Sequence, residues 1–332
     1  MNGRHRAGRH AIAVLSVVAA LPFTFAFALA GQGSTTTTTT AAPFAVVLGT
    51  AQDGGLPQIG GVAPEDVAAR VDPDRRRLVA SLLIVDPRSG ERFLIDATPD
   101  LPAQTEIADR IAPRSKSVSR PPLFDAIALT HAHVGHYAGL LHLGREIYGA
   151  SSQRVLASER MAAFLEKNGP WELLVRLKHI RLERFQTGAV VKLNDRISIT
   201  PIVVPHRDEY SDTHGFMVRG PSRSVLWLPD IDKWEKWDRH IEEVIAAVDV
   251  AYVDGTFFDE TELAGRAMSE VPHPFIAESL TRFAPMPVNQ RAKVVFMHLN
   301  HTNPAATMNS AAQQAIEKAG MRVAREGERQ PL

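Results

Sequence analysis

Three histidines lie within six residues of one another in the segment Thr130-His131-Ala132-His133-Val134-Gly135-His136. An apolar run at 125–129 directly precedes them and predicts a strand that ends at the cluster. Neutral imidazole is a common metal ligand, and ligands two and five residues apart on a loop can converge on one ion. A chance group of solvated histidines is the alternative, but side chains with a function concentrate in loops of this kind. The segment therefore predicts a metal site.

Other polar residues stand where further strands are expected to end. Loops at the strand ends of one sheet edge gather distant residues at one site. We therefore expect these residues to join the histidine cluster. They are Asp96 after the run at 92–95, His206 after 197–205, Asp230 after 224–228, Asp254 after 248–253, and His298 after 292–297.

The whole pattern predicts many short strands with interspersed helices. This mixture is typical of an α+β or layered α/β protein, and we expect it to form a single domain. Strands are expected at 44–48, 78–85, 92–96, 125–129, 154–157, 180–185, 189–193, 197–205, 215–219, 224–228, 248–253, 292–297 and 321–325, and helices at 101–111, 137–148, 159–167, 171–177, 234–247 and 305–318.

The composition excludes several classes of site. Apolar residues make up 45% of the 332 residues and charged residues 22%, which is ordinary for a globular protein. Lysine plus arginine equals aspartate plus glutamate at 37 each, so no net positive field attracts nucleic acid, and we expect a small-molecule substrate. There is no cysteine. Disulfides, thiolate zinc sites and cysteine nucleophiles are excluded, and histidine or carboxylate must hold any metal.

The N-terminal segment predicts export. Residues 1–30 resemble a signal peptide, with Arg4, Arg6 and Arg9 before an apolar stretch at 11–29 that ends in Ala28-Leu29-Ala30. Residues 31–43 form a threonine-rich linker, and the folded domain is expected at 44–332. We expect a periplasmic or extracellular protein. Because the apolar stretch is long, an uncleaved membrane anchor is the alternative, and it would be the only membrane contact.

The order of the polar residues resembles a known family. Asp96, His131-x-His133-x-x-His136, His206, Asp230 and His298 are similar to the five-motif pattern of the metallo-β-lactamase superfamily. The segments at 48–58 and 298–304 look most like the branch that contains pyrroloquinoline-quinone biosynthesis protein B. The resemblance implies a four-layer αβ/βα sandwich with a dinuclear metal site at one edge.

The resemblance also implies a role for each matching residue. His131, His133 and His206 would bind the first metal, His136 and His298 the second, and Asp230 would bridge the two. Asp96 would hold the loop from behind the ligands. Zinc is the expected metal, as one or two ions, with iron or manganese as alternatives.

One position departs from the family pattern. The superfamily's usual His-x-His-x-Asp-His carries an aspartate where this chain has Gly135. We expect the second metal position to be weaker, unless another carboxylate substitutes. Asp53 in the glycine-rich loop at 49–55 is the candidate, against the simpler interpretation of a turn residue. A mononuclear site is the other alternative.

Two further histidines, His273 and His301, are candidates for a catalytic or binding role. Asp254 and His273 resemble the carboxylate–histidine pair that acts as general acid in the superfamily's tRNA-processing endonucleases, so His273, oriented by Asp254, would protonate a leaving group. A structural histidine in a proline-rich turn is the alternative. His301 is a second choice for the ligand assigned to His298, or a substrate contact.

These observations leave three functions open. The first is an exported metal-dependent hydrolase that uses metal-activated water on an ester, lactone, amide or phosphodiester. The second keeps the site but performs oxygenase or redox chemistry linked to a quinone cofactor. The third binds a metal or quinone without turnover.

Overall fold

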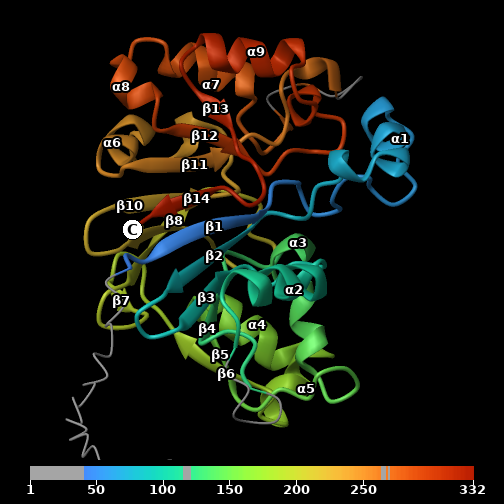
Figure 1. Ribbon diagram of the computed structural model, residues 1–332, viewed down its shortest axis with the longest axis vertical. Coiled ribbons are helices and arrows are strands. Elements are labelled where there is room, and N and C mark those ends of the chain that lie inside the picture. The colour runs from blue at the N-terminus through green and yellow to red at the C-terminus, as the bar shows by residue number, and fades with distance from the viewer. Residues whose placement is uncertain (1–40, 115–120, 263–266, 268–269) are drawn as a thin grey trace, which may run out of the picture. The chain divides into compact units, whose positions relative to one another are not determined.

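Two seven-stranded sheets lie face to face in the computed structural model (Figure 1). The first has the order β14-β1-β2-β3-β4-β5-β6 and the second β13-β12-β11-β10-β9-β8-β7. Their strands are β1 (Phe44–Gly49), β2 (Ser81–Asp86), β3 (Glu91–Ile95), β4 (Ala126–Ala128), β5 (Gln153–Ala157), β6 (Ile180–Arg184), β14 (Arg329–Pro331), and β7 (Val191–Lys192), β8 (Ser198–Val204), β9 (Thr213–Arg219), β10 (Ser224–Leu228), β11 (Val250–Asp254), β12 (Val294–Met297), β13 (Arg322–Val323).

The structure describes residues 41–114, 121–262, 267 and 270–332. The predicted signal peptide at 1–30 and most of the predicted linker lie outside these residues. The described residues form one compact unit. Within the described ranges, no helix has the length and apolar character needed to cross a bilayer.

Each sheet is antiparallel at one end and parallel at the other. In the first sheet β3, β4, β5 and β6 are parallel neighbours. In the second sheet the parallel neighbours are β10, β11, β12 and β13. The carboxyl ends of parallel neighbours share one edge of a sheet, so the loops after these strands are the ones that can assemble a site.

Apolar side chains fill three layers between four layers of structure. The inner faces of the two sheets pack against each other through side chains such as Phe93, Phe216, Trp227 and Tyr252, all at most 2% exposed. The outer face of the first sheet packs against α2 (Leu101–Ile111), α4 (Glu159–Lys167) and α5 (Trp171–Arg176). The outer face of the second packs against α6 (Ile241–Ala246), α7 (Ile276–Phe283) and α9 (Ala311–Lys318). The predicted αβ/βα sandwich is confirmed.

The largest error of the sequence prediction is the helix expected at 137–148. The structure has a short α3 (Val134–Tyr137) and a 3₁₀ turn at Ala138–Leu143 instead. Gly139 gives the reason, because a Cβ there would lie 2.1 Å from the backbone oxygen of Thr98. The chain at this point packs against the loop after β3 more closely than a regular helix with side chains allows.

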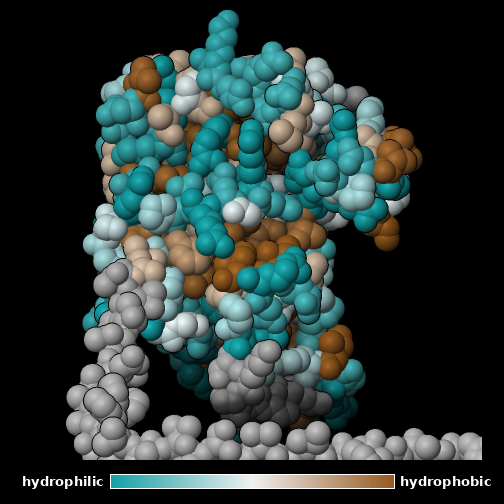
Figure 2. Space-filling view, in the orientation of Figure 1, coloured by the Kyte–Doolittle hydropathy of each residue, from teal (hydrophilic) through white to brown (hydrophobic). Residues whose placement is uncertain are grey.

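Several short elements were not expected from the sequence. Besides β14, they are α1 (Pro64–Val71), α7, α8 (Val288–Arg291) and 3₁₀ turns at Pro73–Arg75 and Glu260–Glu262. The helices expected at 234–247 and 305–318 begin as 3₁₀ turns at Trp234–Lys236 and Pro304–Ala306, and their α-helical parts are α6 and α9. The segment around α1 carries exposed apolar side chains, with Ile59 94% and Val62 87% exposed, and forms the apolar projection in Figure 2. It also carries the fully buried Asp66, whose Oδ2 bonds to His301 Nδ1 at 2.7 Å.

Candidate metal centre

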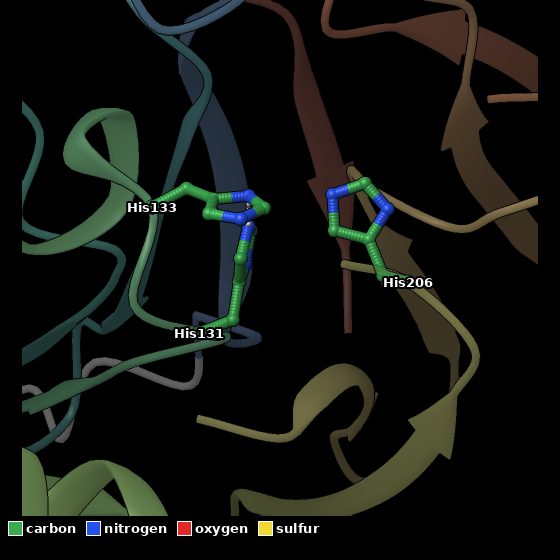
Figure 3. Close-up of side chains that lie close together, drawn as sticks. All are labelled: His131, His133 and His206. Atoms are coloured by element: carbon green, nitrogen blue, oxygen red, sulfur yellow. Dashed lines mark hydrogen bonds between the residues drawn. The ribbon is translucent and has the colours of Figure 1, made fainter. Parts of the chain in front are cut away.

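The strand-end residues of both sheets meet at one edge. The loop after β4 supplies His131 and His133, and the loop after β8 supplies His206, which faces them from the other side (Figure 3). One nitrogen from each of these three rings lies within 4.8 Å of the other two. The ring centroids of His131 and His206 are 5.4 Å apart, and those of His133 and His206 are 4.9 Å apart. This trio could hold a metal ion.

A second group lies beside the first and shares Asp230 with it. Asp230 Oδ2 is 3.1 Å from His136 Nε2 and 3.3 Å from His298 Nε2. The other oxygen, Oδ1, is 3.6 Å from His206 Nε2. The carboxylate therefore spans both groups, as expected for a bridging residue, and it is 3% exposed.

Several polar atoms at this edge are buried without a hydrogen-bond partner among the described residues. A buried polar atom without a partner is costly, and convergent imidazole and carboxylate lone pairs are the donors that zinc and similar cations prefer. The donor set therefore fits a divalent cation. Within the described residues, these atoms are Asp53 Oδ1, His136 Nε2, both ring nitrogens of His206, Asp230 Oδ2 and His298 Nε2.

Behind the first group, Asp96 and Thr130 orient the histidines. The Thr130 hydroxyl lies 3.0 Å from both oxygens of Asp96 and 3.0 Å from His131 Nδ1. Because a carboxylate can only accept, the hydroxyl donates to Asp96 and accepts the proton of His131 Nδ1. His131 Nε2 is thereby left as a lone pair that faces the site. His136 Nδ1 also bonds to Asp96, at 2.8 Å.

A matching arrangement stands behind the second group. Asp254 Oδ1 accepts the Thr256 hydroxyl at 2.7 Å, and this hydroxyl lies 3.0 Å from His298 Nδ1. Asp254 Oδ2 bonds to His273 Nδ1 at 2.8 Å. His273 is 4% exposed, and its ring centroid is 5.1 Å from that of His206. The structure thus brings the predicted Asp254–His273 pair to the site.

Two of the buried site residues have left-handed backbone conformations. Asp96 has φ of 67° and His298 has φ of 62°. Residues other than glycine rarely adopt such values, and they occur most often where function fixes the chain. Each residue directly follows a strand, so the left-handed turn redirects its side chain from the sheet to the shared edge.

Burial and the neighbouring charges set the protonation states. Burial lowers the pKa of His131 well below its ordinary value and that of His206 to about 4. Burial opposes the charge of His136 too, but Asp96 and Asp230 outweigh it and raise its pKa well above the ordinary value. Burial would raise the pKa of Asp230, but His298 and His136 hold it well below the usual range. Asp230 is therefore a carboxylate, and His131 and His206 are neutral, at pH 7.

Of the two remaining predicted residues, Asp53 lies at the site and His301 does not. Asp53 Oδ1 lies 3.5 Å from His136 Nε2, and Asp53 forms a possible metal-binding group with His136 and His298. His301 belongs to none of the possible metal-binding groups among the described residues. It bonds instead through Nδ1 to Asp66 Oδ2 at 2.7 Å, so its interaction is with α1.

Sequence reasoning missed three residues that contact the site histidines. Glu209 Oε2 bonds to His133 Nε2 at 2.9 Å, which leaves Nδ1 of that ring facing His131. Thr130 and Thr256 are the hydroxyl partners described above. The threonines could have been found from their positions next to the predicted site residues, whereas Glu209 lies in an irregular loop that carries no sequence signal.

Comparisons with known proteins identify the family of this chain. Residues 91–319 match the family model described as a beta-lactamase superfamily domain. Coenzyme PQQ synthesis protein B of Methylobacterium nodulans is 29% identical over 306 residues, 85% of this chain and 98% of the relative. That of Rhodopseudomonas palustris is 27% identical over 308 residues, 85% of this chain and 97% of the relative.

Solved structures share the fold. Zn²⁺-bound PqqB from Methylobacterium extorquens has a TM-score of 0.73 and 20% identity, over 87% of this chain and 100% of the other. A diphosphatase from the PhnP family has a TM-score of 0.61 and 19% identity, over 88% of this chain and 98% of the other. The resemblance to the metallo-β-lactamase superfamily, and to its branch with the quinone synthesis protein, is confirmed.

Proposed function

Because the chain belongs to the beta-lactamase superfamily, we propose that it is a metal-dependent hydrolase of a small-molecule ester, lactone, amide or phosphodiester. The observation that carries the proposal is the convergence of unpaired, buried imidazole and carboxylate atoms at the sheet edge. Such a donor set binds a divalent cation, and in this fold class zinc is the expected ion. The balanced charge of the chain supports a small substrate over nucleic acid.

Two metal positions follow from the two groups. His131, His133 and His206 would hold the first ion, and His136 and His298 the second, with Asp230 between them. When bound, the ions would supply a water of lowered pKa and stabilise negative charge on the substrate. Thr130 and Thr256 keep the proton of a ligand histidine on Nδ1, so that Nε2 is free to coordinate.

His273 is the proposed source of the proton for the leaving group. Asp254 accepts from His273 Nδ1 at 2.8 Å and fixes the orientation of the ring beside His206 and Asp230. A histidine held in this way by a carboxylate is suited to general acid catalysis. Hydrolysis releases an alkoxide or amide-anion leaving group that needs this proton. Metal binding alone would not require a proton donor at this position.

Metal analysis followed by a substrate screen tests the proposal. Purified protein should contain zinc, hydrolyse at least one of the generic ester, lactone or phosphodiester substrates, lose turnover with a chelator and regain it with zinc. His273→Ala should lower kcat by about 10²–10⁴-fold with its zinc content unchanged. Zinc-loaded protein without turnover on any class would refute hydrolysis. Normal turnover of His273→Ala would remove the acid role alone.

A second candidate function comes from the relatives. Coenzyme PQQ synthesis protein B matches 85% of this chain, which favours a reaction or binding role related to a quinone cofactor. The same purified protein separates the possibilities. One bound iron with oxygen uptake would support a redox role, and tight quinone binding without turnover would support a binding protein.

We also propose that the protein is exported, on the basis of residues 1–30. Fractionation of cells that express the full chain should place it in the periplasm or medium, with a mature N-terminus at Gly31. An intact N-terminus in the membrane fraction would indicate the anchor, and cytoplasmic protein would refute export.

A further inference from the structure

We propose that Asp53, from the loop after β1, supplies the carboxylate of the second metal position that the superfamily pattern carries at residue 135. The inference deepens the proposed function and rests on its metal site. It concerns one juxtaposition: the carboxylate of Asp53 lies in the space that a side chain on residue 135 would occupy. The ligand would thus come from another loop, and the glycine at position 135 leaves room for the Asp53 carboxylate.

A side chain at residue 135 and the observed side chain of Asp53 cannot both be present, because they would occupy the same space. A Cβ on Gly135 would lie 2.0 Å from Asp53 Oδ1, 2.7 Å from Asp53 Cα and 2.9 Å from Asp53 Cγ. Real Cβ atoms essentially never approach other atoms this closely, and one of the three is backbone. Gly135 is not among the glycines with positive φ. Glycine is therefore needed at this position for space and not for backbone conformation.

The Asp53 carboxylate faces the second metal position. Its Oδ1 is buried, lacks a hydrogen-bond partner in the part of the chain that the structure describes, and lies 3.5 Å from His136 Nε2. One oxygen of Asp53 is within 4.8 Å of the ligand nitrogens of both His136 and His298. An aspartate that serves only a turn accepts from nearby backbone N–H groups. Asp53 Oδ1 accepts no such hydrogen bond from any described residue. A cation between this oxygen and the rings of His136 and His298 would offset the cost of burying it.

Hydrogen bonds hold the Asp53 loop against the segment that carries His298. Gln52 N–H donates to the carbonyl of Leu299, and Leu299 N–H donates to the carbonyl of Thr50, each at 2.8 Å. Asn300 Nδ2 donates to Gln52 Oε1 at 2.5 Å. Asp53 is thus held next to the second metal position by contacts of its loop with the two residues that follow His298.

Zinc binding by a set of reciprocal variants tests the exchange. Equilibrium dialysis with metal analysis should give two zinc ions per wild-type chain. Asp53→Ala should keep the first ion and bind the second at least about tenfold more weakly. Asp53→Gly combined with Gly135→Asp should restore the second ion. Cobalt substitution gives an independent signature, because the visible spectrum of the second ion should change in Asp53→Asn and return in the exchanged variant.

A steric variant tests the shared space without removing a ligand. Gly135→Ala should weaken the second ion and lower the unfolding temperature, whereas the same substitution in an Asp53→Gly background should cost no further stability. This non-additivity is expected only of residues in contact. Wild-type metal content and unfolding temperature in Gly135→Ala would overturn the shared space.

The outcomes separate this inference from the proposed function. If wild-type protein binds two zinc ions and hydrolyses a substrate while Asp53→Ala retains both ions with wild-type affinity, the inference is wrong and the function stands. If Asp53→Ala loses the second ion but zinc-loaded wild-type protein turns over no substrate, the inference stands and hydrolysis is wrong. Failure of the exchanged variant to recover the second ion, in a folded protein, would contradict the relocation of the ligand.

Discussion

A change at the hydroxyl of Thr256 tests the site without removing a metal ligand, because the hydroxyl contacts His298 from behind. Thr256→Val keeps the shape of the side chain and removes its hydrogen bonds. Thr256 is fully buried, and its hydroxyl donates to Asp254 at 2.7 Å and accepts from His298 Nδ1, 3.0 Å away. Valine leaves His298 Nδ1 without this acceptor and removes one hydrogen bond from Asp254 Oδ1, which keeps the Thr256 N–H at 2.9 Å, so we expect the free energy of unfolding to fall by about 2 kcal/mol.

The larger effect should be on the second metal position. Without the hydroxyl, nothing keeps the proton of His298 on Nδ1, and loss of such an outer partner costs about 10–100-fold in metal affinity. Thr130→Val is the matched variant for the first position, since Thr130 contacts His131 in the same way. Competition with a chromophoric chelator measures both affinities, with His298→Ala and His131→Ala as references for each position.

The pattern of losses decides the prediction. Thr256→Val should resemble a mild His298→Ala, and Thr130→Val a mild His131→Ala, while Thr256→Ser should retain wild-type affinity because it keeps the hydroxyl. If Thr256→Val loses stability but binds both ions as tightly as wild-type protein, the hydroxyl is merely structural. The reasoning about its proton would then be wrong.

Three further predictions concern residues outside the ligand set. Burial raises the pKa of Glu326 to about 7 from 4.5, so the folded state holds this proton more tightly than the unfolded chain. The free energy of unfolding should therefore fall by up to about 3 kcal/mol as pH rises from 4.5 to 7. Urea titrations at several pH values should show this slope in the wild-type protein and a flatter one in Glu326→Gln. Gly139→Ala should destabilise by about 1–3 kcal/mol in thermal unfolding, because its Cβ would meet the carbonyl of Thr98; unchanged stability would show that this packing is loose. Glu209→Ala should weaken the first ion by about tenfold or less, since Glu209 is half exposed; an unchanged affinity would show that His133 needs no partner.

Strand-end residues could be predicted from the sequence because each follows an apolar run. His131, His206 and Asp230 are such residues, and the structure brings them together. The interruption of the helix after His136 could not be predicted, because it depends on the approach of Gly139 to Thr98 in another loop. The contact of His133 with Glu209 joins residues 76 positions apart, and its geometry is decided by how two loops pack.

The position of His301 shows the same limit. Its place in the motif allowed a ligand role, but its ring bonds to Asp66 of α1, an element without a strong sequence signal. The eight residues of α1 are largely exposed, with only Asp66 and Ala69 buried, so hydrophobic periodicity is weak there. A motif gives the order of candidate residues along the chain, whereas the neighbours of each residue decide which of them face the site.

The two sheets contribute to the site in the same way. In the first, Asp96 follows β3 and its N–H donates to Ala128 of the parallel neighbour β4; in the second, Asp254 ends β11 and the following N–H, of Gly255, donates to Met297 of β12. Each aspartate then holds a threonine hydroxyl that contacts a histidine. Asp230, from β10, reaches both groups. A cation pair at this edge would therefore join the sheets, and since only the folded chain assembles the ligands, zinc at 100 times its Kd should add about 2.7 kcal/mol to the free energy of unfolding per ion.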